Sequence, residues 1–211
     1  MKFLIFHGSY GSSQGDWFPY LKNQLELINQ VVIAPQMPVE NLSEITKLGE
    51  KKAKAKNQNL NNWLEYFKKN SYKLIKNKKD IVFIGHSLGS IFILQAVEKF
   101  DIQLDSAIFV SPFLEVPTDK SHWQYDLVNE SFYKTDFDFV KLKKFIPVSY
   151  VVYGNDDPYI KKEYVVEFGS KMNSSFIEVK RGKHLDAEFK FFSFPLIFEL
   201  CKTRLDAVDY L

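Results

Sequence analysis

The chain places a serine between two glycines where a predicted strand meets a predicted helix. Residues 85–89 read Gly-His-Ser-Leu-Gly, with an apolar run at 81–84 before them and an apolar stretch at 88–99 after them. This is the G-x-S-x-G pattern in the strand–turn–helix context of a nucleophile elbow. A sharp turn would project the Ser87 hydroxyl above the sheet, and glycine on both sides would avoid collisions with neighbouring elements. The pattern predicts a nucleophilic serine; the alternative is an ordinary serine helix cap with glycines nearby.

A nucleophilic serine needs a base within hydrogen-bonding reach, and the base needs a carboxylate to orient it. Where this elbow occurs, the chain order is serine, acid, histidine. His184, in RGKHLD, is the one histidine of four that follows the last predicted strand. His7 and His86 adjoin motif glycines, and His86 is expected to point away from the serine. His122 precedes any suitable acid and is the alternative base.

The acid is expected after the strand before that of His184. The stretch YVVYGNDDPYI ends a β-rich run and offers Asp156 and Asp157 in tandem before Pro158. We favour Asp157 as the acid, with Asp156 as the alternate. The aspartate that is not the acid is expected to cap the loop or accept a backbone N–H. A plain Asp-Pro turn would also explain the pattern, without a catalytic role.

Acyl chemistry at a serine also needs N–H donors for the oxyanion. The backbone N–H of Leu88, at the start of the helix, is the first candidate. The second is the backbone N–H of Ser9, in the loop FHGSYGSSQGDW that follows the first strand, with Tyr10 behind it. A dinucleotide-binding loop is the competing interpretation. The glycines do not spell G-x-G-x-x-G, however, and no acidic residue ends the second strand.

Composition restricts the class of protein. The 211 residues are 45% hydrophobic and 16% aromatic, which suits a single globular domain spanning 1–211. The formal net charge of +2 gives no electrostatic argument for nucleic-acid binding. Cys201 is the only cysteine, so no internal disulfide can form, and a packed thiol in a reducing compartment is expected. We find no signal peptide and no apolar run of about 20 residues. The expectation is a cytoplasmic protein with no membrane partner.

Short apolar runs alternate with longer helical patterns. The runs are nearly continuous in Val, Ile, Phe and Tyr, which predicts strands buried on both faces of a parallel sheet with helices on both sides. The predicted strands are residues 2–6, 31–34, 81–84, 107–110, 148–153 and 175–180. The predicted helices are residues 17–29, 60–76, 88–99, 161–171 and 194–205. Seven of the nine glycines follow predicted strands, and parallel strands end at one rim of a sheet, so one site built from several loops is expected there.

Two segments fall outside this alternation. Residues 35–59 form a long, weakly periodic link that is expected to be partly helical. Residues 111–147 form an irregular insert rich in aromatic side chains, including Phe113, Trp123 and Tyr133. A loop of this length inside a compact domain is often a lid or binding element. The alternative is a satellite cluster packed over the edge of the sheet.

The stretches LIFHGSYGS, FIGHSLGS, YGNDDPYI and RGKHLD together resemble the α/β-hydrolase superfamily over close to the whole chain. More narrowly, they resemble its small single-domain serine hydrolases, the retinoblastoma-binding-protein-9-like group. The resemblance implies a sheet of about six strands in the order 2-1-3-4-5-6, with Ser87, Asp157 and His184 as the catalytic triad. It also places the loop of Ser9 beside Ser87.

The chain departs from that family in two respects. The sheet is shortened, because larger members have two strands before the one that opens this chain. The first loop is poorer in glycine than in many members, so Tyr10 would narrow the pocket or hydrogen-bond a substrate.

The function expected is a serine hydrolase that cleaves a small carboxylic ester or an amide through an acyl-enzyme, without metal or organic cofactor. Two other classes fit the same residues. An acyltransferase would use the same triad with an acceptor other than water, and a binding protein would keep the fold without turnover. The sequence identifies no protein partner.

Overall fold

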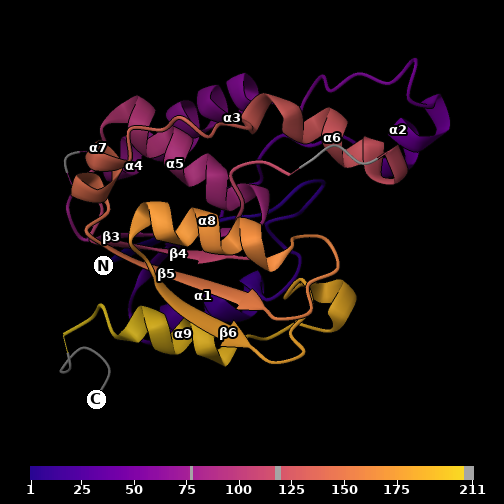
Figure 1. Ribbon diagram of the computed structural model, residues 1–211. Helices are drawn as coiled ribbons and strands as arrows, with labels where there is room; N and C mark the ends of the chain where they lie inside the picture. Colours follow the sequence, from indigo (N-terminus) through magenta and orange to yellow (C-terminus); the bar gives the residue numbers. More distant parts are fainter. Residues whose placement is uncertain (77, 117–119, 207–211) are drawn as a thin grey trace.

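The computed structural model describes residues 1–76, 78–116 and 120–206, and its centre is a six-stranded parallel sheet (Figure 1). All five pairs of neighbouring strands are parallel, in the order β2-β1-β3-β4-β5-β6. The strands are β1 (Lys2–Phe6), β2 (Val31–Ile33), β3 (Ile81–His86), β4 (Ser106–Val110), β5 (Val148–Gly154) and β6 (Ser175–Val179). The predicted fold class and strand order are confirmed.

Helices cover both faces of the sheet. The helices are α1 (Phe18–Leu27), α2 (Leu42–Leu48), α3 (Leu60–Phe67), α4 (Lys73–Ile75), α5 (Leu88–Phe100), α6 (Trp123–Asn129), α7 (Phe139–Phe145), α8 (Lys162–Met172) and α9 (Pro195–Lys202). Figure 1 shows α1 and α9 on one side of the sheet and α3, α5, α7 and α8 on the other. None of the helices within the described ranges is long and apolar enough to cross a bilayer.

Alternate residues of the strands build two separate cores, because successive side chains of a strand point to opposite faces. On the α5 side, Leu4 and Phe83 pack with Phe92 and Phe168. On the α1 side, neighbouring strand residues pack with α1 and α9, and this second core includes Cys201. The predicted packed thiol is confirmed, and burial raises the pKa of Cys201.

The edge strands correct the expectation that every strand is buried on both faces. β1, β3 and β4 are buried almost throughout. In β2, however, Val31 is 51% exposed, and in β6, Phe176 is 42% exposed. An edge strand has a neighbour on one side only, and its β-branched and aromatic residues suit a strand whether or not a helix covers them. The apolar run therefore identified the strand but not its place in the sheet.

The helix expected over 60–76 is one continuous helical run from Leu60 to Ile75, with a π-helix at Lys68–Tyr72 between α3 and α4. The insert at 111–147 is not irregular, because it carries α6, α7 and two 3₁₀ turns, at Lys120–His122 and Glu130–Phe132. Its residues 117–119 lie outside the described part of the chain. The link at 35–59 is partly helical, as expected, through α2.

Candidate active site

The turn between β3 and α5 holds Ser87 in a left-handed backbone conformation. Its φ is 52° and its ψ is −122°, and its N–H donates to the carbonyl of Val110 at 2.8 Å. The glycines on either side are required by space. A Cβ on Gly85 would lie 2.7 Å from the Gly89 backbone, and a Cβ on Gly89 would lie 2.4 Å from the carbonyl oxygen of Phe6. A strained serine persists only where its surroundings hold it, and here the turn is tightly packed on itself at Gly85 and against the end of β1 at Gly89.

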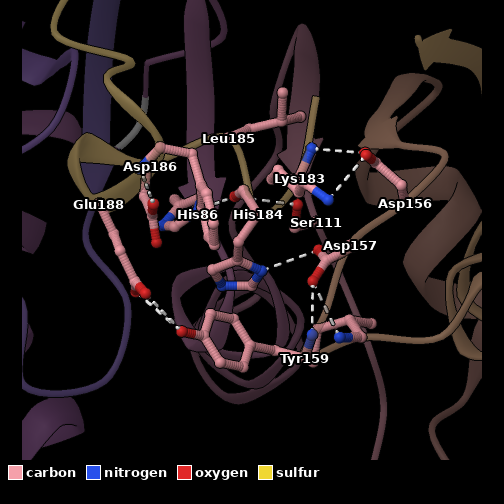
Figure 2. A network of polar contacts seen from close by, with 12 residues as sticks. His86, Ser111, Asp156, Asp157, Tyr159, Lys183, His184, Leu185, Asp186 and Glu188 are labelled. Carbon is pink, nitrogen blue, oxygen red and sulfur yellow. Dashed lines mark hydrogen bonds and ion pairs between the residues drawn. The ribbon is translucent and has the colours of Figure 1, made fainter. Parts of the chain in front are cut away.

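The ends of β5 and β6 bring an aspartate and a histidine together (Figure 2). The Nδ1 of His184 lies 2.8 Å from Oδ2 of Asp157, and the Asp157 side chain is only 2% exposed. The other oxygen of Asp157 accepts the N–H groups of Tyr159 at 2.8 Å and Ile160 at 3.0 Å. With Nδ1–H donating to the carboxylate, Nε2 of His184 is left free to accept a proton.

The charge state of Asp157 follows from these contacts. Burial alone would raise the pKa of this carboxyl. The hydrogen bond and positive charge of His184, together with the two backbone N–H donors, outweigh burial and hold the pKa below its ordinary value. Asp157 is therefore an anion at neutral pH, and an anion in this position stabilises a protonated imidazole.

Ser87 and His184 line one cavity of about 480 Å³ at the carboxyl ends of the strands. Its wall is rich in aromatic side chains, and the insert and the β5–α8 segment supply them: Phe113, Tyr125, Tyr133, Tyr159 and Tyr164. The position agrees with the rim at which open α/β sheets bind ligands.

The loop after β1 packs directly against the turn at Ser87, because β1 and β3 are neighbours in the sheet. A Cβ on Gly8 would lie 3.0 Å from the Cβ of Ser87. The next residue, Ser9, also lines the cavity, and its hydroxyl donates to Oδ1 of Asn129 in α6 at 2.6 Å. The loop of Ser9 thus lies beside Ser87, and the roles of the Ser9 and Leu88 N–H groups as oxyanion donors stay a prediction.

The Tyr10 hydroxyl makes a hydrogen bond within the protein. It donates to the carbonyl of Gln124 in α6 at 2.6 Å, and the Tyr10 N–H donates to Oε1 of Gln58 at 2.9 Å. Within the described residues, Tyr10 is not part of the cavity wall. Its contacts join the loop after β1 to the insert.

Asp156 and His122, the alternative acid and base, contact other residues. Oδ1 of Asp156 accepts the Lys183 N–H at 2.9 Å, and its Oδ2 lies 3.0 Å from the Lys183 ammonium. This is the backbone contact expected of the aspartate that is not the acid. His122 is exposed on the cavity wall, with Nδ1 2.9 Å from the Ser121 hydroxyl.

A family model described as "Serine hydrolase" matches residues 3–203. The chain belongs to this serine hydrolase family. YdeN from Bacillus subtilis is 25% identical over 199 residues, which cover 93% of this chain and 92% of YdeN. The crystal structure of YdeN superposes with a TM-score of 0.76 at 21% identity, over 96% of this chain and 97% of YdeN.

A second solved structure shares the fold. Est1E from Butyrivibrio proteoclasticus has a TM-score of 0.66 at 17% identity, over 96% of this chain and 86% of Est1E. These likenesses support the superfamily given by the sequence motifs. The narrower resemblance to the retinoblastoma-binding-protein-9-like group stays a prediction.

His86 is a site residue that the sequence did not reveal. Its Nε2–H donates to the carbonyl of His184 at 2.9 Å, and the two rings lie 4.9 Å apart (Figure 2). That its side chain points away from Ser87 stays a prediction. The Ser111 hydroxyl donates to the same carbonyl at 3.3 Å. Burial first, and then the nearby charge of His184, lower the pKa of His86, so it stays neutral. No sequence signal distinguishes an outward from an inward side chain at this position of the elbow.

The segment that enters α1 also holds the loop of His184. Nε1 of Trp17 donates to the carbonyl of Leu185 at 2.9 Å, and Oδ1 of Asp16 accepts the Ala187 N–H at 2.9 Å. The residues are far apart in the chain, so no spacing rule could have identified them.

In the part of the chain that the structure describes, no group of three or more His, Cys, Asp or Glu residues is placed to hold a metal ion.

Proposed function

We propose that this protein is a serine hydrolase that cleaves a small carboxylic ester through an acyl-enzyme. Ser87 is the nucleophile, His184 the general base and Asp157 the acid that orients it. One observation carries the proposal. A serine held in a strained elbow and a buried His184–Asp157 pair at 2.8 Å open onto the same cavity.

In the first half of the reaction, the Ser87 oxygen attacks the ester carbonyl while Nε2 of His184 takes the hydroxyl proton. The carbonyl oxygen becomes an oxyanion, which the backbone N–H groups of Leu88 and Ser9 stabilise. The carbon–oxygen bond to the leaving alcohol then breaks, and His184 gives its proton to that alcohol. Asp157 stabilises the imidazolium throughout.

In the second half, water attacks the acyl-enzyme. His184 takes a proton from the water, a second oxyanion forms in the same place, and the Ser87 oxygen leaves with the proton returned by His184. An amide would follow the same route with an amine as the leaving group.

The aromatic part of the cavity wall favours an acyl group with an apolar or aromatic portion, although the wall also carries the carboxylates of Asp16, Asp126, Asp186 and Glu188. Aromatic side chains supply large apolar area with fixed geometry, and the insert at 111–147 contributes Phe113, Tyr125 and Tyr133 to the wall. This supports a binding role for the insert; its closing as a lid stays a prediction. The single, buried Cys201 suits the reducing cytoplasm in which we place the reaction.

A fluorophosphonate probe with p-nitrophenyl esters of graded chain length tests the proposal. We expect labelling at Ser87, and we expect Ser87→Ala and His184→Ala to remove nearly all turnover. Ser170→Ala, an exposed serine at the far end of α8, is the matched control and should retain full turnover and labelling. Labelling of Ser87 without hydrolysis of any ester would favour an acyltransferase. An unlabelled protein would favour a binding protein, and full activity of Ser87→Ala would refute the triad.

A further inference from the structure

Three consecutive side chains after β5 each accept a hydrogen bond from the loop that carries His184. Oδ1 of Asn155 accepts the Arg181 N–H at 2.8 Å, and Oδ1 of Asp156 accepts the Lys183 N–H at 2.9 Å. Oδ2 of Asp157 then contacts the His184 ring at 2.8 Å. We propose that Asn155 and Asp156 are positioning residues that hold the backbone on the N-terminal side of His184, so that its ring meets both Asp157 and Ser87. This inference rests on the proposed role of His184.

The backbone of this loop is strained at three positions. Arg181, Lys183 and Leu185 have φ values of 57°, 53° and 58°, so every second residue around His184 is left-handed without being glycine. Such residues are uncommon and persist where the surroundings over-determine them. The first two of these three residues are the ones whose N–H groups Asn155 and Asp156 accept.

The end of β5 touches the loop without an intervening side chain. A Cβ on Gly154 would lie 2.1 Å from the carbonyl oxygen of Lys183 and 2.6 Å from its nitrogen. The Asn155 N–H donates to the Val179 carbonyl at 3.1 Å, which fixes the same strand end against β6. The acceptors at 155 and 156 are therefore presented from a rigid strand end directly onto the loop.

The other contacts of the loop act on the far side of His184. His86 and Ser111 donate to the His184 carbonyl, and Trp17 donates to that of Leu185. Asp156 acts on the other side, at the Gly182–Lys183 peptide, which is one peptide before the one that joins His184. Figure 2 shows Asp156 and Asp157 on neighbouring sides of the same loop, one bonded to Lys183 and the other to the His184 ring.

Asp156 positions the loop through the hydrogen bond that it accepts from the Lys183 N–H, and not through its ion pair with the Lys183 ammonium. Its pair with the Lys183 ammonium joins side chains that are 32% and 45% exposed, so solvent screens it. Asparagine keeps an oxygen acceptor at Oδ1 and loses only the charge. Asp156→Asn should therefore keep the loop in place, whereas Asp156→Ala should release it.

The kinetic test compares these two variants with wild type on one p-nitrophenyl ester. For Asp156→Ala we expect kcat to fall about 10- to 100-fold with KM nearly unchanged, because displacement by about 1 Å costs roughly that factor in a positioned site. Asp156→Asn should recover most of the loss, and Lys183→Met should stay within about threefold of wild type. Asp138→Ala is the matched control, because Asp138 likewise accepts a backbone N–H, that of Lys141, but at α7. It should lower the melting temperature without changing kcat.

A spectroscopic measurement tests the position of the His184 ring without a substrate. The low-field proton resonance of the His184 Nδ1–H, bonded to Asp157, should be present in wild type and in Asp156→Asn and should shift or broaden in Asp156→Ala. If wild type hydrolyses no ester, the proposed function fails while this resonance still tests the positioning. An unchanged kcat and resonance in Asp156→Ala would overturn the inference, as would equal damage in the Asn and Ala variants.

Should Asp156→Ala fold poorly, the double variant Asp156→Ala with Lys183→Gly separates positioning from stability. Glycine accepts a φ of 53° without strain and so restores stability, but it restores no tether to the strand end. We expect the melting temperature to recover and kcat to stay low. Recovery of both would show that Asp156 only relieves strain, and the inference would be wrong.

Discussion

The side chain of His86 is bonded to the backbone of His184, with Nε2 of the first donating to the carbonyl of the second at 2.9 Å. His86 is the residue immediately before the Ser87 elbow, so this bond joins the turn after β3 to the loop after β6 across the two intervening strands. The candidate nucleophile and base are thus fixed to one another through a buried histidine, in addition to the sheet beneath them.

Removing this link should cost both stability and rate. In His86→Ala, a buried cavity replaces the ring, and only Ser111 still donates to the His184 carbonyl. We expect the free energy of unfolding to fall by about 1–3 kcal/mol, and kcat to fall with it. His86→Gln keeps an amide donor and should lose less of both. Urea denaturation and ester turnover measure the two effects; a variant with wild-type kcat would show that the link has no part in placing His184.

The tandem aspartates should respond very differently to the same substitution. Asp157→Asn presents an amide to Nδ1 of His184, favours the wrong tautomer and removes the charge that stabilises the imidazolium. We expect kcat to fall by up to about 10⁴-fold, as is typical when a triad acid loses its charge. Asp156→Asn keeps its backbone acceptor and should retain most activity. Steady-state kinetics on one ester compares them, and a larger loss at Asp156 would reassign the acid.

The rim of the sheet could be predicted from the sequence because parallel strands end on the same side. Ser87, Asp157 and His184 each follow a β-rich run, and that placement alone gathers them at one edge. The elbow is equally local. A Cβ on Gly85 would meet the Gly89 backbone and a Cβ on Gly89 would meet the end of β1, and the motif records both requirements.

Contacts between loops could not be predicted in this way. The hydroxyl of Ser9 meets Asn129, and the ring of Trp17 meets the carbonyl of Leu185, across separations of 120 and 168 residues. These pairings depend on how each loop leaves its strand, and residue types do not encode that direction. The π-helix at Lys68–Tyr72 could not be predicted either, because no residue type marks the change from i+4 to i+5 hydrogen bonding.

Acid should destabilise this protein partly through His7. Its Nδ1–H donates to the Gly8 carbonyl at 2.8 Å, and its Nε2 accepts the Met37 N–H at 3.1 Å, so the buried ring is held neutral. Burial lowers the pKa of His7 below 6.5. Below about pH 6.5, His7 therefore binds a proton in the unfolded chain but not in the folded state. The free energy of unfolding falls as the pH falls.

The measurement is the free energy of unfolding from urea titrations at several values between pH 7.5 and 5. His7→Gln should remove up to one proton from the pH dependence, a slope smaller by up to about 1.4 kcal/mol per pH unit. Equal slopes in wild type and His7→Gln would mean that His7 is protonated in the folded state.

The elbow allows a sharp test of packing at Gly89. In Gly89→Ala the new Cβ would stand 2.4 Å from the Phe6 carbonyl oxygen, which is backbone and cannot rotate away. The turn and β1 would have to separate, and separation moves Ser87 relative to the loop of Ser9. We expect both the melting temperature and the rate of fluorophosphonate labelling to fall steeply. In Gly15→Ala the nearest atom is the Ser12 carbonyl oxygen at 3.3 Å, which needs to shift by only a few tenths of an ångström, so both should change far less than in Gly89→Ala. A Gly89→Ala protein with normal labelling would show that the strand and the turn can separate without disturbing the nucleophile.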